Sequence, residues 1–170
     1  RLDEALLANQ TVVRLDPKDS EAHYNLGISQ KNMGMFELAE ASYRQAIALN
    51  PNFAEAHGNL GTTLMDFGRL DQAETSYRQA ISIKPDYAEA YNNLGTTLKQ
   101  LGRLENVEAN YRKAIAIKPD FAEAYSNLSM TLKDQGDLAK VKGIELIIDA
   151  FKKRSIIKKD KLVFVLIGYG

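Results

Sequence analysis

The sequence predicts an all-α protein built as an array of helical hairpins that repeat every 34 residues. Each of the four prolines lies 34 residues after the previous one, at Pro17, Pro51, Pro85 and Pro119. Between them, every unit carries two stretches whose apolar residues recur at helical spacing. One such hairpin cannot bury its apolar stripe alone, so a repeat of this length indicates stacked units with a continuous core.

The register follows when the proline is placed at position 32 of the repeat. Complete units then cover residues 20–53, 54–87 and 88–121, and the second and third units are identical at 21 of 34 positions. Residues 1–19 predict the second helix of a preceding unit, and residues 122–139 predict an incomplete fourth unit. The array therefore spans residues 1–139, and residues 140–170 lie outside the repeat.

Each unit predicts two helices joined by a tight turn. The first helix has apolar or small residues at positions 4, 7, 8 and 11, which form one helical face: Tyr91, Leu94, Gly95 and Leu98. A glycine at position 15 suits a positive φ just after the helix: Gly34, Gly68, Gly102 and Gly136. The second helix carries Leu104, Val107, Tyr111, Ala114 and Ile117, and ends before the proline, which disfavours helical geometry in the preceding residue.

Short polar residues and small residues complete the predicted unit. Capping boxes are expected at Asn52–Glu55, Asp86–Glu89 and Asp120–Glu123.

The glycines at position 8 (Gly27, Gly61 and Gly95) are expected to face small residues at position 20 (Ala39, Ala73 and Val107). The tyrosines at position 24 and the alanines at position 27 are expected to pack against the next unit: Tyr43, Tyr77, Tyr111, Ala46, Ala80 and Ala114.

The residues that recur in this way resemble the tetratricopeptide repeat family: Tyr91, Leu94, Gly95, Leu98, Val107, Tyr111, Ala114 and Pro119. Tyrosine or histidine stands at position 4, where the family usually has tryptophan. The resemblance covers residue 20 to about residue 139. It implies a right-handed superhelix with a concave face lined by the first helix of each unit, and a function in binding other proteins.

Composition excludes several other classes of protein. Lys+Arg and Asp+Glu balance at 22 each, so no global field attracts nucleic acid or anionic membrane. The absence of cysteine excludes disulfides and thiolate metal sites. No apolar stretch is long enough to span a membrane, and no signal peptide is visible. We expect a cytoplasmic protein, and the start at Arg1 indicates a piece of a longer chain.

The repeats offer no catalytic constellation. The two histidines, His23 and His57, both fall at position 4 and are interpreted as replacements for the usual aromatic residue. The pairs Glu40–Arg44, Glu74–Arg78 and Glu108–Arg112 have i,i+4 spacing and are interpreted as surface stabilisers, with a partner-binding site as the alternative. The sequence therefore predicts no catalytic residue, metal or cofactor in this chain, and a scaffold rather than an enzyme.

Position 6 is asparagine in all four units: Asn25, Asn59, Asn93 and Asn127. Asparagine is a poor helix former, and its amide both donates and accepts hydrogen bonds. The pattern resembles the asparagine ladder of O-linked N-acetylglucosamine transferases, which implies a groove that holds a peptide backbone, with Thr62, Thr96 and Lys99 beside the amides. The alternative is that recent duplication copied the asparagines passively. Position 5 lacks the lysine of the family's carboxylate clamps, which argues against binding of chaperone C-termini.

The last residues predict a different structure. Ile144, Ile147, Ile148 and Phe151 form a helical stripe, and a basic linker follows. The six apolar residues 162–167 then indicate a buried strand, so the tail is expected to be an αβ unit. With Lys142–Gly143 it resembles the donor-binding half of GT-B glycosyltransferases, which implies the alternative function of a substrate-presenting module. A plain solubilising cap, or a homo-oligomer formed through residues 162–167, are the other interpretations.

Overall fold

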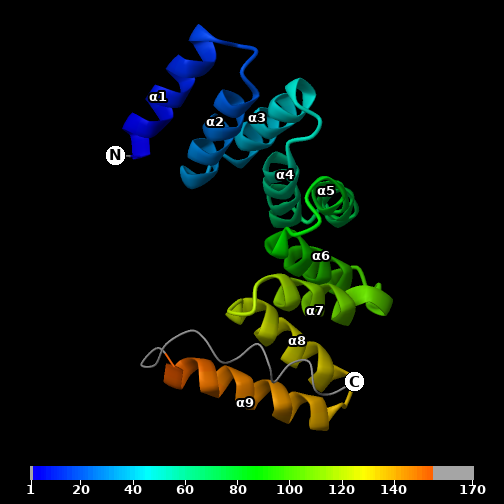
Figure 1. Ribbon diagram of the computed structural model, residues 1–170. Coiled ribbons are helices and arrows are strands. Elements are labelled where there is room, and N and C mark those ends of the chain that lie inside the picture. The colour runs from blue at the N-terminus through cyan, green and yellow to red at the C-terminus, as the bar shows by residue number, and fades with distance from the viewer. Residues whose placement is uncertain (1, 155–170) are drawn as a thin grey trace.

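The computed structural model describes residues 2–154, and the side chains of residues 2–137 and 140–150 within them (Figure 1). Every regular element in this range is helical, which confirms the predicted fold class. The elements are α1 (Leu2–Leu15), α2 (Ser20–Asn32), α3 (Phe36–Leu49), α4 (Ala54–Asp66), α5 (Leu70–Ile83), α6 (Ala88–Gln100), a 3-10 turn η1 (Leu104–Asn106), α7 (Val107–Ile117), α8 (Ala122–Asp134) and α9 (Leu138–Arg154).

The helices pair as hairpins α2–α3, α4–α5, α6–α7 and α8–α9, stacked into an elongated, curved array with α1 and α9 at opposite ends (Figure 1). Consecutive first helices touch, α4 with α6 and α6 with α8. Between residues 2 and 154, consecutive second helices make no contact of that extent. The array is therefore narrower on the side of the first helices, which form its inner face, while the second helices α3, α5 and α7 form its outer face.

The turn inside each hairpin has the predicted glycine geometry. The φ angles are 74° at Gly34, 70° at Gly68, 72° at Gly102 and 77° at Gly136. The Gly68 N–H donates to the carbonyl of Met65 at 2.9 Å, and the Arg69 N–H donates to the carbonyl of Leu64 at 2.9 Å. These two bonds form a Schellman motif, which satisfies carbonyls at the end of the first helix.

The predicted capping boxes are wrong. The N-cap residues are one position later, and they are aromatic and make no side-chain cap bond: Phe53, Tyr87 and Phe121. Two of the glutamates expected to reach back instead accept from lysines at the end of the same unit. Lys84 Nζ lies 2.8 Å from Glu55 Oε1, and Lys118 Nζ lies 2.9 Å from Glu89 Oε1. The charged lysine offers these two carboxylates a stronger bond than a neutral backbone N–H. Glu123 accepts from Asn92 Nδ2 of the preceding unit at 3.0 Å.

The two helices of a unit meet where a tyrosine ring lies on a glycine. A Cβ atom at Gly61 would lie 2.8 Å from the Tyr77 ring, and the matching distances are 2.6 Å at Gly27 and 2.8 Å at Gly95. The glycines therefore face tyrosines of their own unit. The expected facing of Ala39, Ala73 and Val107 stays a prediction. The expectation that these tyrosines pack against the next unit also stays a prediction, and the Tyr77 hydroxyl pairs with Asn93 of that unit.

The second helix of the third unit begins irregularly. Residues 104–106 form a 3-10 turn, whereas the equivalent residues of α3 and α5 are α-helical. Val107 occupies, fully buried, the site that Ala39 and Ala73 hold in the earlier units. The larger, β-branched side chain at this closed site accompanies the tightened first turn.

The end of the described chain is one helix. Helix α9 runs continuously across residue 139 and packs on α8, with Ile144 buried and Ile147 and Ile148 half-buried. It takes the place of a second helix in the fourth unit, so the αβ tail finds no support between residues 140 and 154. The predicted strand at 162–167 and the oligomer contact assigned to it lie outside the described residues. Of the helices between residues 2 and 154, none combines the length and apolar character that a bilayer span requires.

We expect Gly61→Ala to lower the free energy of unfolding by about 1–3 kcal/mol, because the added methyl group forces the buried Tyr77 ring to move. Gly143 is the matched control, since it lies inside α9 with no atom within 4 Å of an added Cβ. Gly143→Ala should raise stability by up to about 1 kcal/mol through helix propensity. Urea titrations followed by circular dichroism measure both changes. Equal stabilisation by the two substitutions would contradict the tyrosine–glycine contact.

Candidate functional site

The inner face carries the four predicted asparagines, one on each first helix, α2, α4, α6 and α8. All four side chains are half-buried. Asn59 Nδ2 donates to the Tyr24 hydroxyl at 3.1 Å, and Asn127 Nδ2 donates to Asn92 Oδ1 at 2.9 Å. In both bonds the acceptor is at position 5 of the preceding unit. The asparagines therefore link consecutive units, a role that the sequence alone did not indicate.

Asn93 is bonded differently because the preceding unit has Gly58 at position 5. The Tyr87 ring fills the space left by the missing side chain, with its hydroxyl 2.9 Å from where a Gly58 Cβ would lie. Burial raises the pKa of Tyr87 to about 12. Asn93 Oδ1 instead accepts from Asn92 Nδ2 at 3.3 Å. The Asn93 amide group also donates to the Tyr77 hydroxyl oxygen.

Asn25 is linked through its backbone. Its carbonyl accepts from Asn9 Nδ2 at 3.2 Å, and the same amide donates to Ser29 Oγ at 2.8 Å. Asn9 belongs to α1, at the position that tyrosine holds in the complete units. Asparagine amides on the inner side thus join α1 to the array as well.

The side chains of the predicted groove residues Thr62 and Thr96 are hydrogen-bonded to the hydroxyl groups of buried tyrosines. Tyr77 donates to Thr62 Oγ1 at 3.1 Å, and Thr62 donates onward to the Gly58 carbonyl at 3.1 Å. Tyr111 lies 3.2 Å from Thr96 Oγ1, which donates to the Asn92 carbonyl at 3.2 Å. Burial raises the pKa of both tyrosines. The threonine hydroxyls therefore support the core beneath the inner face.

Charges on the inner face are paired within and between units. Lys99 Nζ lies 2.6 Å from Asp134 Oδ2 in the next unit. The Lys84 ammonium lowers the pKa of Glu55 through its hydrogen bond to that carboxylate. With Glu89 bound to Lys118 as well, the stripe around the asparagines carries neutralised pairs rather than a field of one sign.

The histidines hold their rings against the preceding loop. His23 Nε2 lies 3.0 Å from the Pro17 carbonyl, and His57 Nε2 lies 3.0 Å from the Pro51 carbonyl. Among the described residues, no group of three histidine, aspartate or glutamate side chains is placed to hold a metal ion. Lys142 and Gly143, which carried the resemblance to a glycosyltransferase donor site, lie inside helix α9.

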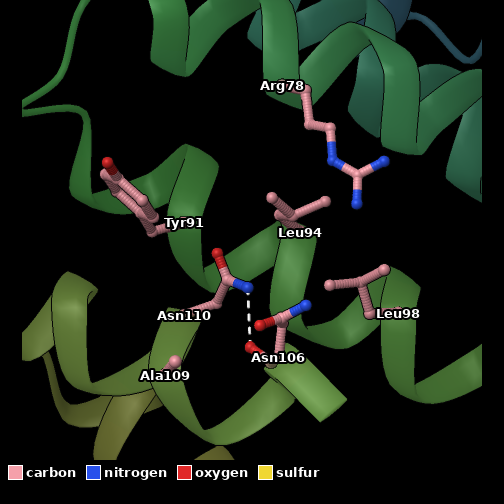
Figure 2. Close-up of a pocket in the computed structure, with 7 residues that line it drawn as sticks. All are labelled: Arg78, Tyr91, Leu94, Leu98, Asn106, Ala109 and Asn110. Carbon is pink, nitrogen blue, oxygen red and sulfur yellow. Dashed lines mark hydrogen bonds between the residues drawn. The ribbon is translucent and has the colours of Figure 1, made fainter. Parts of the chain in front are cut away.

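A second feature lies on the outer face, where two open hollows occur at equivalent places in consecutive units. The larger, about 440 Å³, lies above Leu60 between Arg44 of α3 and Thr75 of α5. The smaller, about 340 Å³, lies above Leu94 and Leu98 between Arg78 of α5 and Ala109 of α7. Figure 2 shows Arg78 on one side of the smaller hollow and Asn106, Ala109 and Asn110 on the other. We call these two hollows the outer grooves.

The sequence placed Arg44 and Arg78 in stabilising pairs, with a partner-binding site as the alternative interpretation, and did not indicate a groove on the outer face. The signal that indicates the grooves is at position 4, where the sequence has His57 and Tyr91 instead of a larger tryptophan. Both residues line an outer groove.

Comparisons with known proteins agree with this architecture. Profiles described as tetratricopeptide repeat match residues 20–53, 88–121 and 42–75, and one described as TPR repeat matches residues 62–102. A search of curated sequences gave no significant match.

Solved structures with the same fold include MamA, at 24% identity over 92% of both chains with a TM-score of 0.84. Pseudomonas aeruginosa PilF matches at 17% identity over 88% of this chain and 68% of that chain, with a TM-score of 0.81. The first TPR of Spaghetti (RPAP3), bound to the HSP90 peptide SRMEEVD, matches at 18% identity over 71% of this chain and 96% of that chain, with a TM-score of 0.68. These identities, all below 25%, show a shared fold.

We expect Tyr77→Phe to lower the free energy of unfolding by about 0.5–1.5 kcal/mol, because it removes the hydrogen bond to Thr62. Tyr43 is the matched control. Its hydroxyl is buried without a hydrogen-bond partner, because the position of Thr62 is taken in its unit by Ile28. Tyr43→Phe should therefore leave stability unchanged or raise it slightly. The midpoints of urea unfolding decide the matter, and a loss in Tyr43→Phe as large as in Tyr77→Phe would refute the hydroxyl assignment.

Proposed function

Because the chain carries tetratricopeptide repeats across residues 20–121, we propose that it is a protein-interaction scaffold that holds an extended peptide along its inner face. A structural neighbour with the same fold carries a bound peptide, which supports the general role of a scaffold. The more specific part of the proposal is that the ligand is an extended peptide, and it is based on the asparagine side chains of the inner face.

The amides of Asn59 and Asn127 retain hydrogen-bonding capacity after linking the units. Each uses one hydrogen of its NH₂ group in the bond to the preceding unit. Among the side chains of residues 2–137 and 140–150, none donates a hydrogen bond to either Oδ1 atom. An acceptor and a second donor hydrogen therefore remain on each side chain. This pair of functions matches the N–H and C=O groups that an extended peptide backbone presents.

The inter-unit bonds also hold these amides in place before any ligand binds. A side chain already fixed by a neighbour loses less conformational entropy when it binds a peptide. The link to the Tyr24 hydroxyl would fix Asn59, and the link to Asn92 would fix Asn127. The same contacts that stack the units therefore prepare the inner face for binding.

The surroundings favour recognition of backbone over recognition of charge. Lys99 is engaged by Asp134, and the threonine hydroxyls at positions 62 and 96 are engaged by tyrosines. In the proposal, Thr62 and Thr96 line the path of the peptide with their methyl groups, and Lys99 borders it. The amides remain as the repeated polar groups along the path, so the peptide is held without strong selection of its sequence.

We expect the double substitution Asn59→Ala and Asn127→Ala to weaken peptide binding by about tenfold or more, since two hydrogen bonds to the ligand are lost. The probes are peptides selected from a random library on the immobilised wild-type chain and titrated by fluorescence anisotropy. Methylation of the peptide backbone nitrogens should weaken binding similarly, because it removes the N–H groups that donate hydrogen bonds to the asparagine Oδ1 atoms.

Asn110→Ala on the outer face is the matched control and should leave the affinity unchanged. Circular dichroism must show equal helicity for all variants, because Asn59→Ala and Asn127→Ala also remove the links to Tyr24 and Asn92. Unchanged affinity in the double variant would exclude the asparagine stripe as the binding site and leave passive duplication as the explanation of the repeated asparagine.

A further inference from the structure

The outer grooves face away from the inner asparagine stripe. Leu60 and Thr62 are two residues apart on α4, so their side chains project about 160° apart around the helix. Leu60 lies beneath the larger groove, while Thr62 lies on the inner side. Leu94 and Thr96 on α6 repeat this arrangement. A ligand on the outer face therefore does not compete directly with one on the inner face.

The two grooves are built from the same repeat positions. Arg44 and Arg78 occupy position 25, Leu60 and Leu94 occupy position 7, and Thr75 and Ala109 occupy position 22. Each groove thus has an arginine on one side, an apolar floor, and a small side chain on the other side. The leucines beneath the grooves are 5% exposed in both units. The outer face therefore presents one binding element twice, at the spacing of the repeat.

The exposed charges beside the grooves are cationic. The Arg44 and Arg78 side chains are 52% and 59% exposed, while their partners Glu40 and Glu74 are 14% and 5% exposed. Each carboxylate is also bound by an arginine of the next unit, Glu40 by Arg69 and Glu74 by Arg103. Arg44 and Arg78 are therefore not needed to neutralise a buried charge. Their guanidinium groups retain donors for an external carboxylate.

From this arrangement we propose that the outer grooves form a second docking surface, which binds an acidic amphipathic helix of a partner protein. An apolar side chain of that helix enters each groove above Leu60 or Leu94. A carboxylate beside it pairs with Arg44 or Arg78. Charge complementarity and the apolar floors together select this partner, because a phosphate backbone would match the arginines but leave the apolar floors unused.

The probe is a blocked helical peptide with leucines on one face and glutamates beside them, compared with a copy in which every glutamate is lysine. We expect the glutamate peptide to bind, and the lysine peptide to bind at least about tenfold more weakly. Fluorescence anisotropy at several salt concentrations measures both affinities. Binding of the two peptides with equal affinity, or no binding of the glutamate peptide, would overturn the proposal.

Two sets of variants locate the peptide. Ala48 and Ala109 line the two grooves and are exposed, so Ala48→Phe with Ala109→Phe fills the grooves without changing the core. This should weaken binding about tenfold or more, because the leucines can no longer be buried. Arg44→Gln with Arg78→Gln should weaken it roughly threefold to tenfold and reduce its salt dependence. If the phenylalanine variants lose helicity, Ala48→Glu and Ala109→Glu test the same contact by repulsion.

Asn59→Ala with Asn127→Ala is the control, since it alters the inner face and should leave the glutamate peptide's affinity unchanged. This separates the proposal from the inner-face function, which can fail or succeed independently. Binding that survives filled grooves but is lost in the asparagine variant would place the peptide on the inner face instead.

A single-stranded RNA that competes with the peptide and still binds after the grooves are filled would also overturn the proposal. Light scattering that shows a dimer abolished by the phenylalanine variants would assign the surface to a second copy of the chain.

Discussion

The contact between a tyrosine ring and a glycine sets the separation of the two helices in each complete unit. The Tyr77 ring occupies the space that any Cβ at Gly61 would need, and the same contact recurs at Gly27 and Gly95. Such close packing places the ring in the core and its hydroxyl near the inner side of the first helix. In the second and third units Thr62 and Thr96 are the partners of that hydroxyl, which offsets the cost of burying an unpaired polar group. Thr62 and Thr96 are therefore constrained by the core, although they lie at the edge of the binding face.

Stacking of the units depends on polar links as well as on apolar burial. On the inner side, asparagine amides reach position 5 of the preceding unit. At the hairpin turns, Arg69 and Arg103 reach glutamates of the preceding second helices. The fourth unit departs from this scheme because Asp137 stands where the arginine would be, and it pairs with Lys140 at 2.7 Å instead. The junction between the third and fourth units therefore lacks the arginine bridge and keeps the bonds of Asn127 to Asn92 and of Lys99 to Asp134.

The periodic features of the fold could be predicted from the sequence because each follows from a local rule. Proline and glycine positions mark the ends of helices, and the 34-residue spacing requires stacking. Features that depend on relative helix positions could not be predicted in this way. The direct contact of the Tyr77 ring with Gly61 was not predicted, because the sequence does not show the rotation of the second helix that brings the ring onto the glycine. The capping boxes failed because the lysine that binds Glu55 lies 29 residues away in sequence.

The same distinction between local rules and relative helix positions applies to the candidate sites. The position of the asparagines on one helical face was predictable, because helical periodicity determines which residues share a face. Their bonds to Tyr24 and Asn92 were not, since position 5 differs from unit to unit and only the stacked structure brings it within reach of the next asparagine. The sequence did not indicate the outer grooves, because they form where the side chain at position 4 is smaller than the usual tryptophan. His57, tied to the Pro51 carbonyl, borders the larger hollow, and the bulkier Tyr91 borders the smaller one. A smaller side chain at position 4 thus accompanies a larger hollow on the outer face. The amide at position 6 determines the hydrogen-bonding groups of the inner face. Because the two positions project in different directions from one helix, a repeat protein can change either surface without changing the other.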